Sequence, residues 1–68
     1  MHLEQLIKVI KERRKILKIN QRELSEFTNI GLRTIKGLES GHTNPTLKTI
    51  VNILDVLGME LSIVTKIK

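Results

Sequence analysis

The sequence predicts a small, mainly α-helical domain of four to five helices, built around a helix-turn-helix and followed by a short β-strand. Apolar residues recur at the helical period through most of residues 3–57. A turn signal divides residues 20–41 into two short segments, and residues 59–67 alternate apolar with polar side chains. We therefore expect a helical domain over residues 1–58 and a strand segment over residues 59–68.

Length and charge restrict the classes of function. These 68 residues provide for one small core, without room for a catalytic domain beside a binding domain. There is no cysteine and no cluster of His, Asp and Glu, so we expect neither a metal nor another cofactor. The formal net charge of +5 favours a polyanionic partner. The single aromatic residue, Phe27, argues against recognition by base stacking, which leaves double-stranded DNA as the better candidate.

The amino-acid sequence shows no signal for export, for membrane insertion or for catalysis. No apolar run approaches about 18 residues and no signal-peptide core begins the sequence, which predicts a cytoplasmic protein that does not bind membranes. Glu39, Ser40 and His42 are close in sequence, but no nucleophile, base and orienting group emerge among them. We therefore do not expect an enzyme.

The first helix is expected over residues 3–17, where apolar side chains form one stripe. Val9 and Ile16 lie on its flank and either complete the same core or meet another element or a second subunit. Arg14 lies on the stripe itself, and a buried guanidinium needs a carboxylate, for which Glu39 is the candidate. A solvated face is the default explanation for the other basic residues of this segment: Lys8, Lys11, Arg13, Lys15 and Lys18.

Residues 20–41 are expected to form two short helices joined by a tight turn, the arrangement that places a helix in the DNA major groove. Asn20 begins the first helix with a capping box, and Leu24 and Phe27 supply its inner face. Asn29 can adopt the left-handed conformation that the turn requires.

The second short helix is expected from about Leu32 to Ser40, with Ile35 and Leu38 facing inward. Gly37 occupies an interior position, where glycine costs roughly 1 kcal/mol relative to alanine. Either the helix approaches another surface closely at this point, or the chain tolerates a poor residue.

The last helix is expected to begin at Thr46 and to end at Gly58, with a buried stripe that runs from Leu47 to Leu57. The tail after Gly58 fits the strand template, yet no second strand is predicted anywhere. An identical strand from a second copy, paired antiparallel about a two-fold axis, would satisfy its backbone groups. A short fifth helix or a frayed tail is the alternative.

These segments resemble the Cro/C1 (Xre) family of helix-turn-helix DNA-binding proteins over nearly the whole chain. The resemblance rests on three stretches: I-N-Q-R-E-L-S-E-F, T-I-K-G-L-E-S-G and N-P-T-L-K-T-I-V-N-I-L-D-V-L-G. The tail L-G-M-E-L-S-I-V-T-K is similar to that of HipB-like antitoxins, in which the helical domain ends in a strand that pairs across the dimer. The resemblance thus implies a lambda-repressor-like domain with a strand that pairs between two copies.

The resemblance also implies roles for individual residues. Base edges would be read from the start and outer face of the second short helix: Leu32, Arg33, Lys36 and Gly37. Phosphates would be contacted by Gln21, Arg22, Thr34, Ser40, His42 and Thr43. Arg14 and Glu39 match a buried ion pair of the family, and the dimer interface would be formed by Met59, Leu61, Ile63 and Val64.

By this resemblance the protein would be a homodimeric transcriptional repressor of a palindromic operator. As the antitoxin of a type II toxin-antitoxin system, it would also bind a HipA-like toxin and repress its own operon. The alternative is a protein-interaction module that neutralises a toxin or scaffolds a partner without reading DNA. Because Gly31 and Leu32 stand where the family usually has polar residues, base readout would centre on Arg33, which can pair with guanine through two hydrogen bonds.

Overall fold

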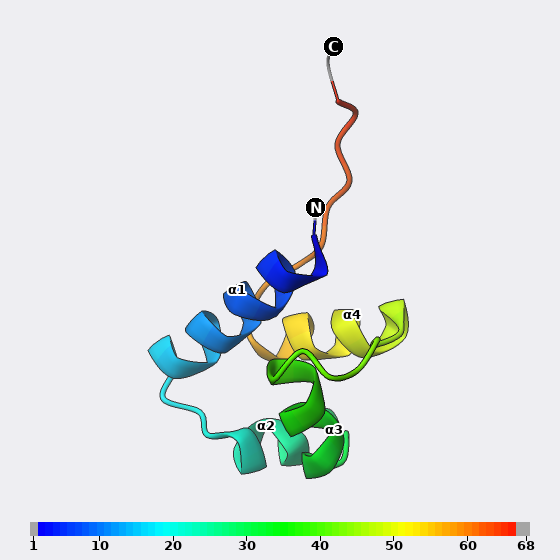
Figure 1. Ribbon diagram of the computed structural model, residues 1–68. Coiled ribbons are helices and arrows are strands. Elements are labelled where there is room, and N and C mark those ends of the chain that lie inside the picture. Colours follow the sequence, from blue (N-terminus) through cyan, green and yellow to red (C-terminus); the bar gives the residue numbers. More distant parts are fainter. Residues whose placement is uncertain (1, 67–68) are drawn as a thin grey trace.

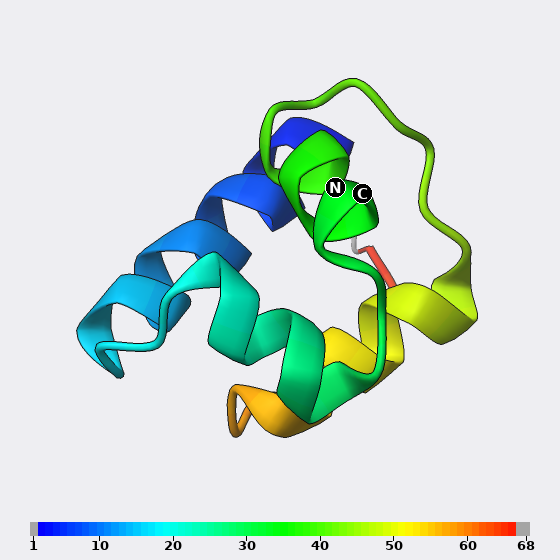
Figure 2. The ribbon, with the colours of Figure 1, turned by 90° about the horizontal axis from the view of Figure 1, so that it is seen from below.

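A computed structural model describes residues 2–66, which contain four α-helices. α1 spans Leu3–Ile16, α2 spans Gln21–Thr28, α3 spans Leu32–Glu39 and α4 spans Leu47–Val56. α2 packs against α3 and α4, and α1 packs against α3. In Figure 1, α2 and α3 lie below α1 and α4, and Figure 2 shows the loop from α3 to α4 curving round the outside.

One hydrophobic core holds the four helices together. Helices of eight residues, such as α2 and α3, would be marginal in water by themselves, so their stability comes from packing. α1, α3 and α4 each supply two or three buried apolar side chains at the helical period, α2 supplies one, and the residue that ends α4 supplies one more. The buried apolar residues are Ile7, Ile10, Leu24, Ile35, Leu38, Ile50, Ile53, Leu54 and Leu57.

Four residues that the sequence assigned to inward-facing stripes lie at the surface, so those assignments were wrong. Leu3 and Leu17, at the two ends of the stripe expected on the first helix, are each 39% exposed. The side chains of Phe27 and Leu47 are 59% and 67% exposed. In α2 the second buried position is Thr28 instead of Phe27. The Thr28 hydroxyl donates a hydrogen bond to the Leu24 carbonyl oxygen at 2.7 Å, which allows a polar side chain to be buried there.

All four helices end in the same way, with a residue in the left-handed conformation. This residue is Lys18 after α1, Asn29 after α2, Gly41 after α3 and Gly58 after α4, with φ angles of 58°, 60°, 78° and 71°. After α4, the Gly58 and Met59 N–H groups donate back to carbonyl oxygens of the last turn at 3.1 and 2.8 Å. These bonds satisfy carbonyl groups that have no partner within the helix and turn the chain sharply.

The tail runs away from the helical body in an extended path (Figure 1). Residues 59–66 form neither a helix nor a strand in this single chain, so the alternative of a fifth helix is wrong for the described part of the tail. Met59 and Leu61 pack against the core, whereas Ile63 and Val64 are 95% and 79% exposed. The remaining tail residues of the predicted strand segment, 67 and 68, lie outside the described residues.

Val9 and Ile16 are 46% and 69% exposed, so they do not complete the core of this chain. Of the two interpretations of these residues, contact with another element or a second subunit therefore stays open. None of the described helices is both long and apolar enough to cross a membrane.

The end of α4 gives a test of the backbone argument. Gly58→Ala should lower the free energy of unfolding by about 1–2 kcal/mol, because alanine is strained in the left-handed conformation. An added Cβ would meet its nearest neighbour, the Arg13 guanidinium, at 3.5 Å, an ordinary contact, so the cost comes from the backbone. Urea unfolding measures the change, and Gly58→Asn is the matched control, with a smaller loss. Equal losses for the two variants would contradict a backbone origin.

Candidate nucleic-acid interface

α2, the turn and α3 form the helix-turn-helix that the sequence predicted. The Glu23 N–H donates to the Asn20 side-chain oxygen at 2.7 Å, and the Asn20 N–H donates to the Glu23 carboxylate at 3.0 Å, which completes the capping box. Asn29 ends α2 in the left-handed conformation with φ 60°. The Ser25 hydroxyl donates to the Ile30 carbonyl oxygen and closes the turn. Local side-chain bonds therefore fix the start of α2 and close the turn that follows it.

A buried ion pair joins α1 to the last residue of α3. Arg14 Nε donates to Glu39 Oε2 at 2.7 Å, and Arg14 Nη2 donates to Glu39 Oε1 at 2.9 Å. The Arg14 and Glu39 side chains are 10% and 3% exposed. Arg14 Nη1 also donates to the Ile19 carbonyl oxygen at 2.8 Å, so the guanidinium binds the chain before α2 as well. The structure thus contains the pair that the sequence suggested.

Gln21 belongs to the same network, which the sequence analysis missed. Its side-chain amide donates to Glu39 Oε1 at 3.1 Å. The first residue of α2 is therefore bonded to the last residue of α3. No spacing in the sequence signals this contact, because the two residues meet only when the helices pack. The Gln21 side chain was expected at a phosphate, and the structure assigns it a partner inside the protein.

The outer face of α3 carries the side chains that the sequence assigned to base edges. Arg33 and Lys36 are exposed, and Leu32 and Gly37 are half-buried. Ser40 follows on the same face, one turn after Lys36, because residues four apart in a helix lie above one another. Together these residues form what we call the recognition face. Of the other predicted phosphate contacts, the exposed residues are Arg22, Thr34, His42 and Thr43.

Gly37 is explained by the loop that follows α3. A Cβ atom at this position would lie 2.9 Å from Cγ2 of Thr43, closer than real contacts allow. The Gly37 carbonyl oxygen accepts hydrogen bonds from the His42 N–H at 2.9 Å and from the Ser40 hydroxyl at 3.0 Å. The glycine therefore permits a close approach, as one interpretation of the sequence proposed, but the approaching surface is the chain's own loop.

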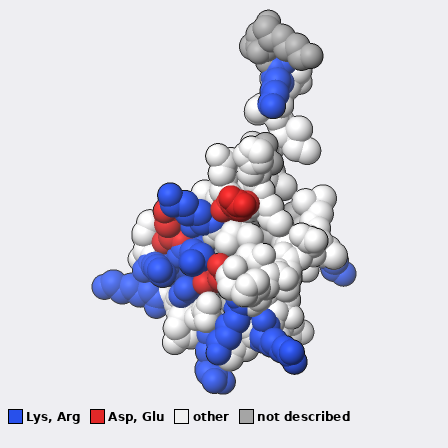
Figure 3. Space-filling model, viewed as in Figure 1, with Lys and Arg blue, Asp and Glu red and all other residues white. Residues whose placement is uncertain are grey.

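Positive charge gathers on the side of the molecule that carries α1, α2 and α3. Most of the Lys and Arg side chains visible in Figure 3 lie over the left and lower parts, whereas the region over α4 is mostly white. Two α1 lysines, Lys11 and Lys15, line the same hollow as Lys36 and Ser40 of the recognition face. Within residues 2–66, no group of His, Asp and Glu is arranged to hold a metal ion.

Comparison with known proteins places this geometry in a family. Residues 10–64 match the family model described as Helix-turn-helix. The chain belongs to the Cro/C1 (Xre) helix-turn-helix family. A curated Haemophilus influenzae protein, named an uncharacterized HTH-type transcriptional regulator, is 39% identical over 59 residues. This alignment covers 87% of the chain and 60% of the relative, so the chain spans less than two thirds of that protein. No solved structure matches the chain.

The ion pair of this Xre-family protein gives a second test. Glu39→Ala should lower the free energy of unfolding by about 3–5 kcal/mol, because it leaves a buried guanidinium without its carboxylate. The double variant Arg14→Met/Glu39→Leu removes both charges and should recover most of the loss. Urea unfolding of Arg14→Met, Glu39→Leu and the double variant measures the coupling between the two residues. Additive losses would show that the two side chains do not act as a pair.

Proposed function

We propose that this protein is a sequence-specific transcriptional repressor that binds double-stranded DNA as a homodimer. The observation that carries the proposal is the recognition face, where Arg33 and Lys36 are exposed on a helix held from behind by Glu39 and Arg14. Family membership and the printed name of the Haemophilus influenzae relative, an HTH-type transcriptional regulator, support DNA regulation. Occupancy of a promoter would suffice for repression.

In this proposal α3 enters the major groove with its outer face against the bases. Arg33 makes two hydrogen bonds to guanine, Leu32 contacts a thymine methyl group, and Lys36 and Gly37 line the same face. Exposed residues at the edges, including Arg22, Thr34, Ser40, His42 and Thr43, contact phosphates. The Gln21 side chain is bonded to Glu39, so Gln21 would contact a phosphate through its backbone N–H, which has no partner within α2.

Arg33 tests the readout. Arg33→Ala should weaken binding to the preferred site by about 1–3 kcal/mol and relax the base preference at one position. The preferred site is first selected from a random duplex pool, and affinities are then measured on selected and random DNA. Arg33→Lys is the matched control, because it keeps the charge and loses the two-bond geometry. An equal loss on both DNAs would show that Arg33 contacts a phosphate and does not read a base. If the unsubstituted protein bound no DNA from any pool at low salt, the DNA-binding function would be refuted.

The tail supports the homodimer. Met59 and Leu61 are half-buried against the chain's own helices, and Ile63 shares their face in an extended chain, where side chains alternate. Ile63 lies beyond the helical body and is 95% exposed. A second copy paired antiparallel along this segment would cover Ile63, would bring Val64 beside the partner strand on the other face, and would satisfy the backbone groups along the edge that the two tails share. The pairing would also set the distance between two recognition faces.

Truncation tests the dimer. A chain that ends at Ser62 keeps the Met59 N–H that caps α4 and the packed Leu61, so it should stay folded. It should sediment as a monomer and bind a two-half-site operator more weakly than the full chain. Ile16→Ser, on an exposed position of α1, is the control and should leave the dimer intact. A dimer that survives truncation and is lost in Ile16→Ser would place the interface on α1.

The tail also favours a second candidate function. An antitoxin of the HipB-like branch would use the same dimer to repress its own operon and would bind a HipA-like toxin. A protein-interaction module without DNA readout is the alternative, and the exposed apolar side chains of Ile63 and Val64 are its support. The DNA pool selection above separates the module from the repressor and the antitoxin, because only a protein that reads DNA enriches a sequence.

A further inference from the structure

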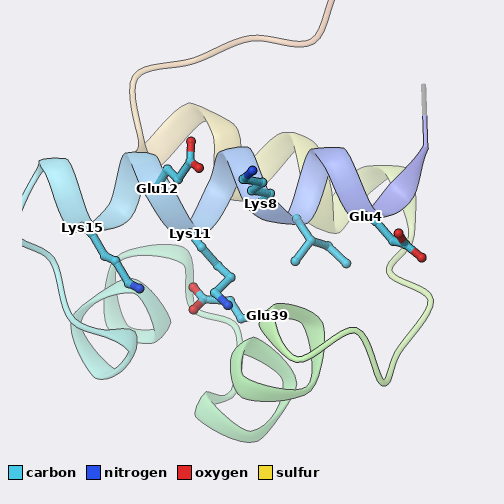
Figure 4. Close-up of a pocket in the computed structure, with 7 residues that line it drawn as sticks. Glu4, Lys8, Lys11, Glu12, Lys15 and Glu39 are labelled. Atoms are coloured by element: carbon cyan, nitrogen blue, oxygen red, sulfur yellow. The ribbon is translucent and has the colours of Figure 1, made fainter.

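A cleft between α1 and α3 lies beside the recognition face. The part toward the start of α1 is lined by three lysines and three glutamates, whereas the part nearest the recognition face is lined by four cations and by Glu39. The cleft consists of two hollows of about 330 and 410 Å³, and Lys11, Lys15 and Glu39 line both of them. The second hollow also includes Lys36 and Ser40, which belong to the recognition face. Figure 4 shows Lys11 and Lys15 pointing from α1 toward α2 and α3. We call this site the lysine cleft.

The carboxylate in the lysine cleft already has partners. Glu39 accepts two hydrogen bonds from Arg14 and one from Gln21. Among the described residues, the pair of Arg14 and Glu39 is the single ion pair, so Lys11 and Lys15 have no carboxylate partner. An anion that enters the cleft therefore meets unpaired ammonium groups and a carboxylate whose charge is compensated.

The position of the lysines along α1 separates the cleft from an ordinary solvated face. Lys8 is four residues from both Glu4 and Glu12, a spacing at which opposite charges stabilise a helix. Lys11 and Lys15 are four residues from each other, so like charges repel there. Glu12 lines the first hollow too and is three residues before Lys15, but in Figure 4 its side chain points up, whereas those of Lys11 and Lys15 point down toward α2 and α3. A bound anion between Lys11 and Lys15 would remove this repulsion.

We propose that the lysine cleft binds one phosphate of the DNA backbone, with Lys11 and Lys15 of α1 as its ligands. This inference rests on the proposed DNA-binding function and adds α1 to the interface. Lys36 and Ser40 line the cleft and lie on the outer face of α3, so a backbone that borders the major groove occupied by α3 passes the cleft. α1 then holds the flank of the site independently of sequence, because phosphate contacts position a protein without reading bases.

Charge removal tests the lysine cleft. Lys11→Gln and Lys15→Gln should each weaken binding roughly 5- to 10-fold at about 0.1 M salt, and the double variant should reduce the log-log salt slope by about 0.9, the value for one phosphate. The loss should be the same on selected and on random duplexes. Lys15→Arg keeps the positive charge and should keep the salt slope of the unsubstituted protein. Lys66→Gln, which removes one charge from the exposed tail, should leave the slope unchanged. Sedimentation should match the unsubstituted protein for every variant, and the unfolding temperature should not fall, because removing Lys11 or Lys15 relieves the repulsion between them.

The outcomes separate this inference from the proposed function. If the unsubstituted protein binds DNA and both α1 variants keep its affinity and salt slope, the lysine cleft is a solvated face and the inference is refuted. If the loss appears on the selected site alone, the lysines act in base readout and the phosphate assignment is wrong. If the unsubstituted protein binds no DNA, the proposed function and the inference fail together.

Discussion

The ion pair between Arg14 and Glu39 fixes the orientation on which the helix-turn-helix depends. Its carboxylate binds α1 through Arg14 and the start of α2 through Gln21, and it stands at the end of α3. The guanidinium adds the carbonyl oxygen of Ile19. Burying two charges costs nearly as much as their attraction returns, so the pair contributes little net stability compared with apolar side chains. Its contribution is geometric, because three segments can satisfy the pair only in one arrangement.

Caps at the helix ends allow two short helices, α2 and α3, to meet at Glu39. α2 and α3 have eight residues each, too few to be stable alone. If either helix began or ended one residue earlier or later, α3 would be rotated by about 100° relative to α1. The capping box at Asn20, the left-handed Asn29 and the left-handed Gly41 restrict where the two helices begin and end. These local bonds set the register, and the buried apolar side chains then hold it.

The four helices could be predicted because apolar residues recur at the helical period. The pair of Arg14 and Glu39 could be predicted because a buried guanidinium without a carboxylate is costly. Phe27 was misassigned, since periodicity alone does not separate neighbouring positions on a narrow inner face. Thr28 is buried there because its hydroxyl reaches a carbonyl oxygen of its own helix. The close approach of Thr43 to Gly37 and the hydrogen bond from Gln21 to Glu39 arise only when the chain packs, and local sequence carries no signal for either of them.

The network around Glu39 also links the two ways in which this surface would hold DNA. Glu39 lines the lysine cleft and ends the helix that carries Arg33, so base readout and backbone contact share one rigid origin. In the proposed complex, a change that tilts α3 would move Lys36 and Ser40 away from Lys11 and Lys15, so the phosphate site would open as the base contacts shift. Because α3 offers few side chains for hydrogen bonds to bases, specificity would depend on this fixed geometry and on the DNA shapes that fit it.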